Sequence, residues 1–241
     1  LGADRGLCSG QTITLDAGNP GATYLWSTGS TTQSILVSAP GNYSVDVTDA
    51  CGITSDQISI FNGAMTVNTG PDLSICSGAS ATLTATGANS YSWNTGQTSS
   101  SITVTPSANT TYTVIGTNIF NCTASDQIEV TVNNAPIAEI VSISGSTTYC
   151  DNNPSILTAN QAAGLTYAWA RNGVLIPNTN IISYLPLQSG QYAVVTTNTF
   201  GCSSTSIPVN ITVLSTPQAT ITPSGNVTLC SGSNLQLDGN T

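Results

Sequence analysis

Short runs of alternating apolar and polar residues fill the first sixty positions of the chain. In the run from Asn42 to Thr48, the apolar side chains of Tyr43, Val45 and Val47 fall on one face, which is the period of a half-buried strand. Turn residues such as Pro40-Gly41 separate the runs. The pattern predicts strands at 11–16, 22–27, 33–38, 42–48 and 55–60. No stretch has a convincing 3.6-residue period.

The same series returns further along the chain. A second set of strands is predicted at 81–85, 90–93, 101–105, 111–115 and 126–132. The cysteines keep the same period. An opening cysteine begins each unit (Cys8, Cys76, Cys150 and Cys230), and a closing cysteine follows near its end (Cys51, Cys122 and Cys202). Successive opening cysteines are 68, 74 and 80 residues apart, a period that indicates a tandem array of small domains.

Aromatic residues occupy fixed places within this period. Each complete unit has a tryptophan in a Tyr-x-Trp sequence and a later tyrosine inside an alternating run. We expect these residues to fill the domain cores: Trp26, Trp93 and Trp169, with Tyr43, Tyr112 and Tyr192. Six or seven short strands around a central Trp predict an all-β fold of immunoglobulin-like sandwiches.

The unit boundaries follow from the repeats and from short linkers. The predicted domains are 1–63 with a truncated first strand, 64–134, 135–215, and the incomplete start of a fourth at 216–241. Two of the three linkers contain proline, which restricts bending more than a Gly/Ser tether does. We therefore expect an extended, semi-rigid rod, and we interpret the chain as a fragment of a longer protein or as one whose broken unit another chain completes.

The cysteines predict one disulfide in each complete domain. Even pairing by domain is typical of secreted proteins, and the expected bridges are Cys8–Cys51, Cys76–Cys122 and Cys150–Cys202. Zinc is disfavoured because the close Cys-x2-Cys pairs and histidines of zinc sites are missing from the sequence. We expect each bridge near one pole of its sandwich. Phe120 and Phe200 are either exposed contact residues at the domain tip or packed over the disulfide, and we favour packing because large apolar side chains are usually at least partly buried.

Charge is scarce and mostly negative. Only 5% of residues are charged, against about 25% in ordinary domains. The sequence has two arginines, no lysine and no histidine, and its net charge is −9. This composition argues against nucleic acid and against anionic membrane surfaces. No run approaches the ~20 apolar residues of a membrane-spanning helix, so no membrane insertion is expected.

Catalysis is not expected. Without histidine or lysine, the nucleophile and base pairs of hydrolases cannot be assembled. Asp56 and Asp126 recur at one repeat position, and Asp4 and Asp72 at another, so we assign them to the fold rather than to chemistry. No cofactor is predicted. A structural calcium ion would be held by three acidic residues at a sandwich end: Asp16, Asp46 and Asp49.

Several sequence elements together resemble a known group. They are Cys76-Ser-Gly78, Leu83-Thr-Ala85, Tyr91-Ser-Trp-Asn-Thr-Gly96 and Ser125-Asp-Gln-Ile128. The pattern is similar to the tandem Ig/PKD-like repeats of very large Bacteroidota surface proteins, such as SprB-type gliding adhesins and other exports of the type IX secretion system. The third unit departs at Trp169-Ala-Arg-Asn-Gly173, and the Trp-Asp-Phe-Gly-Asp-Gly sequence typical of PKD domains is missing, which favours an Ig-like variant.

The resemblance implies export, attachment to the outer membrane and display on the cell surface. The first hypothesis is a non-catalytic stalk or adhesive surface of an adhesin, with a role in gliding motility. A subunit of an assembled extracellular filament is the second, and a carbohydrate-binding module of a secreted enzyme is the third. The partners expected are a surface polysaccharide or other cell-surface ligand, the secretion and motility machinery by resemblance, and further copies of the chain through self-association.

Overall fold

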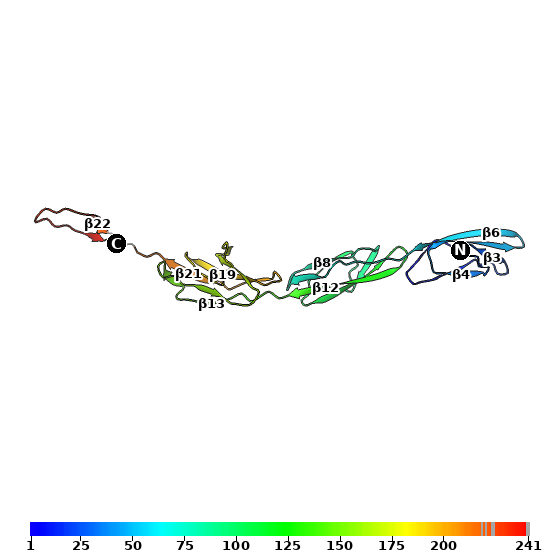
Figure 1. The fold of residues 1–241 in the computed structure, drawn as a ribbon, viewed down its shortest axis with the longest axis horizontal. Helices are drawn as coiled ribbons and strands as arrows, with labels where there is room; N and C mark the ends of the chain where they lie inside the picture. Colours follow the sequence, from blue (N-terminus) through cyan, green and yellow to red (C-terminus); the bar gives the residue numbers. More distant parts are fainter. Residues whose placement is uncertain (218, 220, 223–224, 240–241) are drawn as a thin grey trace. The chain divides into compact units, whose positions relative to one another are not determined.

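A computed structural model describes residues 1–217, 219, 221–222 and 225–239, drawn as a ribbon in Figure 1. Every helix or strand assigned within these residues is a β-strand, as the alternating pattern predicts. The chain separates into two compact units, Leu1–Asn133 and Asn134–Thr241. The first unit contains the first two repeats, and the second contains the third repeat and the start of the fourth.

The first repeat is a sandwich of two sheets. Its strands are β1 (Arg5–Leu7), β2 (Ile13–Asp16), β3 (Thr23–Trp26), β4 (Ser34–Val37), β5 (Gly41–Asp49) and β6 (Gly52–Asn62). One sheet has the order β1-β6-β5-β3, and β2 pairs with β4 in the other. All five strands predicted in this repeat are present, and the two sheets bury the apolar residues between them.

The first strand of the repeat runs parallel to the last. Arg5 lies opposite Ile60, and Leu7 lies opposite Asn62, the final residue of β6. All other pairings in the repeat are antiparallel. The parallel pairing brings the opening cysteine, which follows Leu7, to the end of the repeat where the chain leaves it.

The second repeat has the same topology. Its strands are β7 (Leu73–Cys76), β8 (Ala81–Thr84), β9 (Ser90–Trp93), β10 (Ser101–Val104), β11 (Thr110–Thr117) and β12 (Thr123–Asn133). The sheets are β7-β12-β11-β9 and β10-β8. β7 again runs parallel to the last strand, and Cys76 lies opposite Asn133.

The third repeat keeps this plan with additions. Its strands are β13 (Ile140–Ile143), β14 (Thr148–Cys150), β15 (Leu157–Ala159), β16 (Thr166–Arg171), β17 (Val174–Leu175), β18 (Ser183–Tyr184), β19 (Gly190–Thr197), β20 (Ser203–Thr205) and β21 (Val209–Leu214). β14 runs parallel to β21, with Cys150 opposite Leu214. β16 and β17 form a hairpin through Asn172-Gly173, where both residues have positive φ. This turn accounts for the departure of the third unit from the Thr-Gly sequence.

Each complete repeat has its own hydrophobic core. The core clusters draw on residues 1–60, 65–130 and 140–213 respectively, so each lies inside one predicted domain, although the exact boundaries stay predictions. The three predicted tryptophans are buried, and each indole N–H donates to a backbone carbonyl: Trp26 to Thr32, Trp93 to Ser99 and Trp169 to Ile181. These bonds satisfy the indole in an apolar interior.

The repeated tyrosines differ in burial. Tyr112 and Tyr192 are buried as predicted, whereas Tyr43 is only partly buried at the edge of its core. The hydroxyls of Tyr43 and Tyr192 each donate to the carbonyl four residues upstream, at Ala39 and Gln188. A tyrosine that ties its strand to the preceding corner is a feature of Ig-like sandwiches.

The fourth unit is described in part. β22 (Ile221–Thr222) pairs with β23 (Asp238–Gly239) in an antiparallel arrangement. Within the predicted fourth domain, residues 218, 220, 223–224 and 240–241 lie outside the described part of the chain.

Candidate functional site

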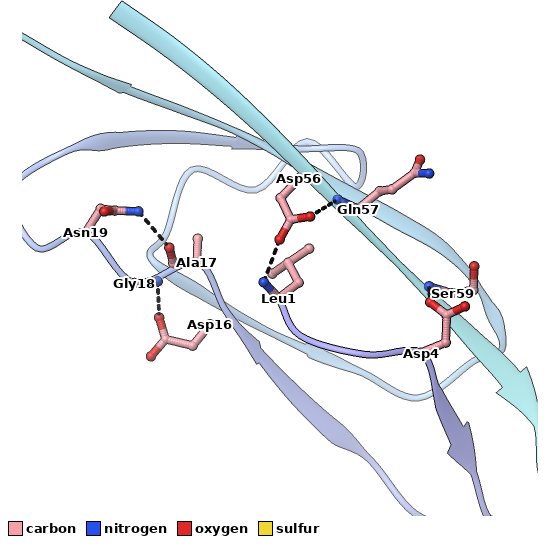
Figure 2. Close-up of polar contacts among 9 residues, drawn as sticks. All are labelled: Leu1, Asp4, Asp16, Ala17, Gly18, Asn19, Asp56, Gln57 and Ser59. Carbon is pink, nitrogen blue, oxygen red and sulfur yellow. Dashed lines mark hydrogen bonds and ion pairs between the residues drawn. The ribbon is translucent and has the colours of Figure 1, made fainter. Parts of the chain in front are cut away.

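The recurring aspartates bind backbone groups of their own repeats. Asp126 accepts hydrogen bonds from the backbone N–H and the hydroxyl of Thr69, each at 2.8 Å. At the corresponding place in the first repeat, Asp56 accepts from the Leu1 ammonium at 2.6 Å (Figure 2). Hydrogen bonding lowers the pKa of both carboxyls, mainly through Thr69 at Asp126 and the Leu1 ammonium at Asp56. Both residues fasten the entry of the repeat to its last strand.

The second recurring pair acts in the same way. Asp4 accepts from the backbone N–H of Ser59, and Asp72 accepts from that of Glu129, each at 2.8 Å. The assignment of these four aspartates to the fold is therefore confirmed. A cavity of about 470 Å³ borders Asp56 in the first repeat, where Leu1, Asp49 and Asp56 are among its lining residues.

The three aspartates considered as calcium ligands accept hydrogen bonds from other groups of the protein. Asp16 accepts a hydrogen bond from the Gly18 backbone N–H (Figure 2). It also accepts one from the Gln33 side chain, and the two bonds lower the pKa of its carboxyl. Asp46 accepts from the Ser55 hydroxyl, and Asp49 from the Cys51 backbone N–H. Among the described residues, no group of three or more Asp, Glu, Cys or His side chains is arranged to hold a metal ion.

The most elaborate polar and covalent arrangement lies at the junction of the first two repeats. Cys8 is bonded to Cys122, with the two Cα atoms 5.3 Å apart and a sequence separation of 114. Cys8 is the opening cysteine of the first repeat, and Cys122 is the closing cysteine of the second. The bond therefore joins successive domains instead of closing a loop inside one domain.

The predicted pairing within each repeat is wrong for a geometric reason. In the first repeat, Cys51 immediately precedes β6, while Cys8 lies beside the other end of this strand, which has 11 residues. At about 3.3 Å per residue, the strand separates the two cysteines by roughly 33 Å. Bridged cysteines require Cα atoms within about 7 Å. The second repeat places Cys122 and Cys76 at opposite ends of β12 in the same manner. In the third repeat, Cys202 directly precedes β20, and Cys150 lies beside the far end of β21.

The bonded and free cysteines divide accordingly. Cys76 and Cys202, an opening and a closing cysteine of successive repeats, are also disulfide-bonded. Within the described residues, Cys51, Cys150 and Cys230 are free and exposed. Cys8, Cys76, Cys122 and Cys202 therefore form disulfides as predicted, but not with the predicted partners. The predicted disulfides of Cys51 and Cys150 are wrong, because both cysteines are free.

A single asparagine organises the loop that carries Cys122. The Asn118 Oδ1 atom accepts hydrogen bonds from the backbone N–H groups of Phe120 (2.9 Å) and Cys122 (3.0 Å). Its Nδ2 atom donates to the carbonyl oxygen of Gly63 at 2.9 Å, in the linker between the repeats. Asn118 therefore holds the bonded cysteine in place and ties its loop to the preceding repeat.

Phe120 packs across the same junction. Its ring stacks on Phe61 of β6, with centroids 5.8 Å apart and an interplanar angle of 16°. Gly6 makes room for the ring, since a Cβ atom at Gly6 would lie 2.2 Å from the Phe120 Cγ atom. The linker glycine Gly63 is equally confined, because a Cβ there would lie 2.7 Å from Cys122 Sγ and 2.9 Å from the Leu7 carbonyl oxygen. The predicted burial of Phe120 is thus partly correct, with Phe61 as its partner.

The closing loop of the third repeat has the same internal bonds. Asn198 Oδ1 accepts from the backbone N–H groups of Phe200 and Cys202, each at 3.0 Å, and its Nδ2 donates to the Asn134 carbonyl at 2.9 Å. Phe200, however, is exposed, which contradicts its predicted packing. Asn118 and Asn198 were missed in the sequence, although an Asn-x-Phe-x-Cys motif recurs at both places and could have identified them.

Comparisons with known proteins return tandem Ig-like domains. No protein-family model matches the chain, and no curated protein does. Similar solved structures include the N-terminal eight Ig domains of Down syndrome cell adhesion molecule (14% identity, TM-score 0.37) and extracellular domains 3–5 of Drosophila OTK (10%, 0.38). A three-Ig-domain fragment of titin is also similar (11%, 0.41). The alignments cover 91%, 88% and 88% of this chain and 36%, 94% and 96% of the others. These similarities concern the fold alone.

The disulfides also bear on location. Bonds of this kind persist in oxidising surroundings and are rare where thiols are kept reduced. The chain is therefore built of Ig-like domains of the extracellular or secreted type. In the described part of the chain, no helix is long and apolar enough to cross a membrane.

Proposed function

We propose that this chain is a non-catalytic stretch of a bacterial surface adhesin, in which Ig-like repeats act as a stalk. The observation that carries the proposal is the Cys8–Cys122 bond between successive repeats. A domain that binds or reacts alone needs no covalent tie to its neighbour. A stalk does, because a joint that resists bending keeps a distant binding region away from the cell surface.

The non-covalent contacts support the same role. Asn118 adds a hydrogen bond to the linker, and the Phe61–Phe120 stack adds an aromatic contact between the two repeats. A linker fastened by three independent interactions has much less hinge freedom than a flexible tether of equal length. The sequence resemblance to gliding adhesins supports placing this stalk on an exported Bacteroidota surface protein.

The experiment is surface labelling of source cells with antibodies raised against the purified chain. Intact, unpermeabilised cells should be labelled, and mild shaving of the surface with a broad-specificity protease should remove the label. Antibody fragments against the chain should also reduce attachment of cells to a surface, compared with fragments against an unrelated protein. Recovery of the intact protein only from the periplasm, with no surface label, would overturn the proposal.

A further inference from the structure

The seven cysteines fall into two structural classes. Every opening cysteine begins a four-residue turn, in which its carbonyl oxygen accepts a hydrogen bond from the backbone N–H three residues later. The four bonds measure 2.9 to 3.1 Å: Gln11 to Cys8, Ala79 to Cys76, Asn153 to Cys150 and Ser233 to Cys230. Cys150 therefore shares this turn hydrogen bond with the bonded cysteines Cys8 and Cys76, although the third residue of its turn, Asn152, does not have the positive φ of Gly10 and Gly78.

The closing cysteines share a different arrangement. In each, the backbone N–H donates to the side-chain oxygen of an Asp or Asn in the same turn: Asp49 for Cys51, Asn118 for Cys122 and Asn198 for Cys202. Each of these cysteines directly precedes a strand on the far side of its repeat from the opening cysteine. Cys51 therefore stands where the bonded cysteines Cys122 and Cys202 stand.

Two rules follow from this geometry. A cysteine cannot reach the other class within its own repeat, because the last strand of the repeat lies between them. The Cys8–Cys122 bond joins an opening cysteine to the closing cysteine of the following repeat. Cys150 and Cys51 are both free and exposed. Cys150 is an opening cysteine, and Cys51 is a closing one.

We propose that Cys150 and Cys51 are covalent attachment sites for further Ig-like repeats of this kind, with opening cysteines bonding only to closing ones. Cys150 takes the closing cysteine of a repeat that follows it, and Cys51 takes the opening cysteine of a repeat that precedes it. A second copy of this chain supplies both partners, and so does another repeat of the same polypeptide. This inference concerns the covalent chemistry of the chain and does not depend on the proposed adhesion function.

The reaction is a two-electron oxidation. Each thiol loses a proton, one S–S bond forms, and the two electrons pass to a disulfide oxidant, which is cleaved to two thiols. In the test, oxidised glutathione serves as the oxidant through a mixed disulfide with one cysteine. The second cysteine then displaces glutathione as a thiol.

The first experiment uses full-length chains that all carry Cys230→Ser. Cys51→Ser leaves only Cys150 free in one variant, and Cys150→Ser leaves only Cys51 free in the other. A third variant with all three serines is the control and should stay monomeric. Because the three substituted thiols are exposed and unbonded, the variants should fold like the parent. Circular dichroism checks their strand content, and mass spectrometry checks that the Cys8–Cys122 bond is intact.

Each variant is incubated with oxidised glutathione, alone and mixed, and resolved on non-reducing gels. Each should stay monomeric alone, and the mixture should form a heterodimer bonded through Cys150 and Cys51. Random collision would give the heterodimer only about twice the yield of each homodimer, whereas recognition between classes should give an excess of about tenfold. Homodimers in comparable yield, or no heterodimer, would overturn the proposal.

A second experiment separates the two sources of the partner. Source cells are treated with an alkylating agent before extraction, and the peptides of Cys51 and Cys150 are mapped without reduction. Bonds within a single polypeptide indicate neighbouring repeats of one chain, and disulfide-linked multimers indicate separate copies. Recovery of both cysteines as alkylated thiols would overturn the assignment.

Discussion

Phe120 of the second repeat stacks on Phe61 of the first, with ring centroids 5.8 Å apart, directly beside the Cys8–Cys122 bond. Aromatic pairs of this kind contribute about 0.5–1.5 kcal/mol beyond the area that they bury. A double-mutant cycle with Phe61→Leu and Phe120→Leu, measured by urea unfolding, should therefore give a coupling free energy in that range. Phe200→Leu is the matched control and should have little effect, since Phe200 is exposed. Additive effects of the two substitutions would show that the rings do not interact.

Gly6 should be intolerant of a side chain only while Phe120 is present. A Cβ at Gly6 would lie 2.2 Å from the Phe120 ring, so Gly6→Ala must displace that ring and should lower the free energy of unfolding by about 1–3 kcal/mol. In a Phe120→Ala background the same substitution should cost much less, because the space is empty. Equal cost in both backgrounds would place the strain elsewhere.

The junction disulfide should dominate the stability of the first two repeats. Cys122→Ser should lower the free energy of unfolding by about 2–5 kcal/mol, since the bond restricts a long loop in the unfolded chain. Cys51→Ser is the control, as Cys51 is free and exposed, and it should leave the unfolding curve unchanged. Thermal and urea unfolding of both variants, with and without a reducing agent, checks this. A reducing agent that destabilised the Cys122→Ser variant as much as the parent would contradict it.

Both the oxygen and the nitrogen of the Asn118 side-chain amide should contribute to the stability of the junction. Asn118→Ala leaves the N–H groups of Phe120 and Cys122 and the Gly63 carbonyl without this partner, at a cost of about 1–3 kcal/mol. Asn118→Asp keeps the acceptor and loses the donor to Gly63, so hydrogen exchange should quicken at the linker while Cys122 stays protected. Exchange at the linker no faster in Asn118→Asp than in the parent would show that the Gly63 contact contributes nothing, and equal exchange at Cys122 in the two variants would show the same for the Oδ1 acceptor.

The stability of the second repeat should fall in acid through Asp126. Its hydrogen bonds from Thr69 lower the pKa of the folded carboxyl below the value in the unfolded chain. The stabilisation is therefore complete above the unfolded pKa of about 3.9, and it is lost as pH falls through the folded pKa. Asp126→Asn should flatten the pH dependence of unfolding between about pH 5 and pH 2 relative to the parent. A parallel curve for the variant would remove Asp126 as a source of the acid sensitivity.

Much of the fold could be read from the sequence because local signals agreed with one another. Alternation around Tyr43 and Tyr112, turn residues between runs and the recurring tryptophans all pointed to the same sandwich. The pairing of cysteines could not be read in this way. The sequence distance between Cys8 and Cys51 does not show which end of the sandwich each cysteine occupies.

The deciding fact was the parallel pairing of β1 with β6, a contact between residues more than fifty positions apart. The exposure of Phe200 was also beyond local pattern, since Phe120 and Phe200 share the same motif and differ only in what surrounds them. By contrast, the assignment of the recurring aspartates to the fold was correct, although their partners lie 55 to 57 positions away instead of in a local turn.

The bond between Cys8 and Cys122 gives the chain two covalent routes from the first repeat to the second. A protease that cuts the linker near Gly63 leaves the fragments attached, because the disulfide still holds them. Separation at this joint requires both a cleaved peptide bond and a reduced disulfide. A surface protein joined in this way would tolerate single cuts at its linkers without shedding what lies beyond them.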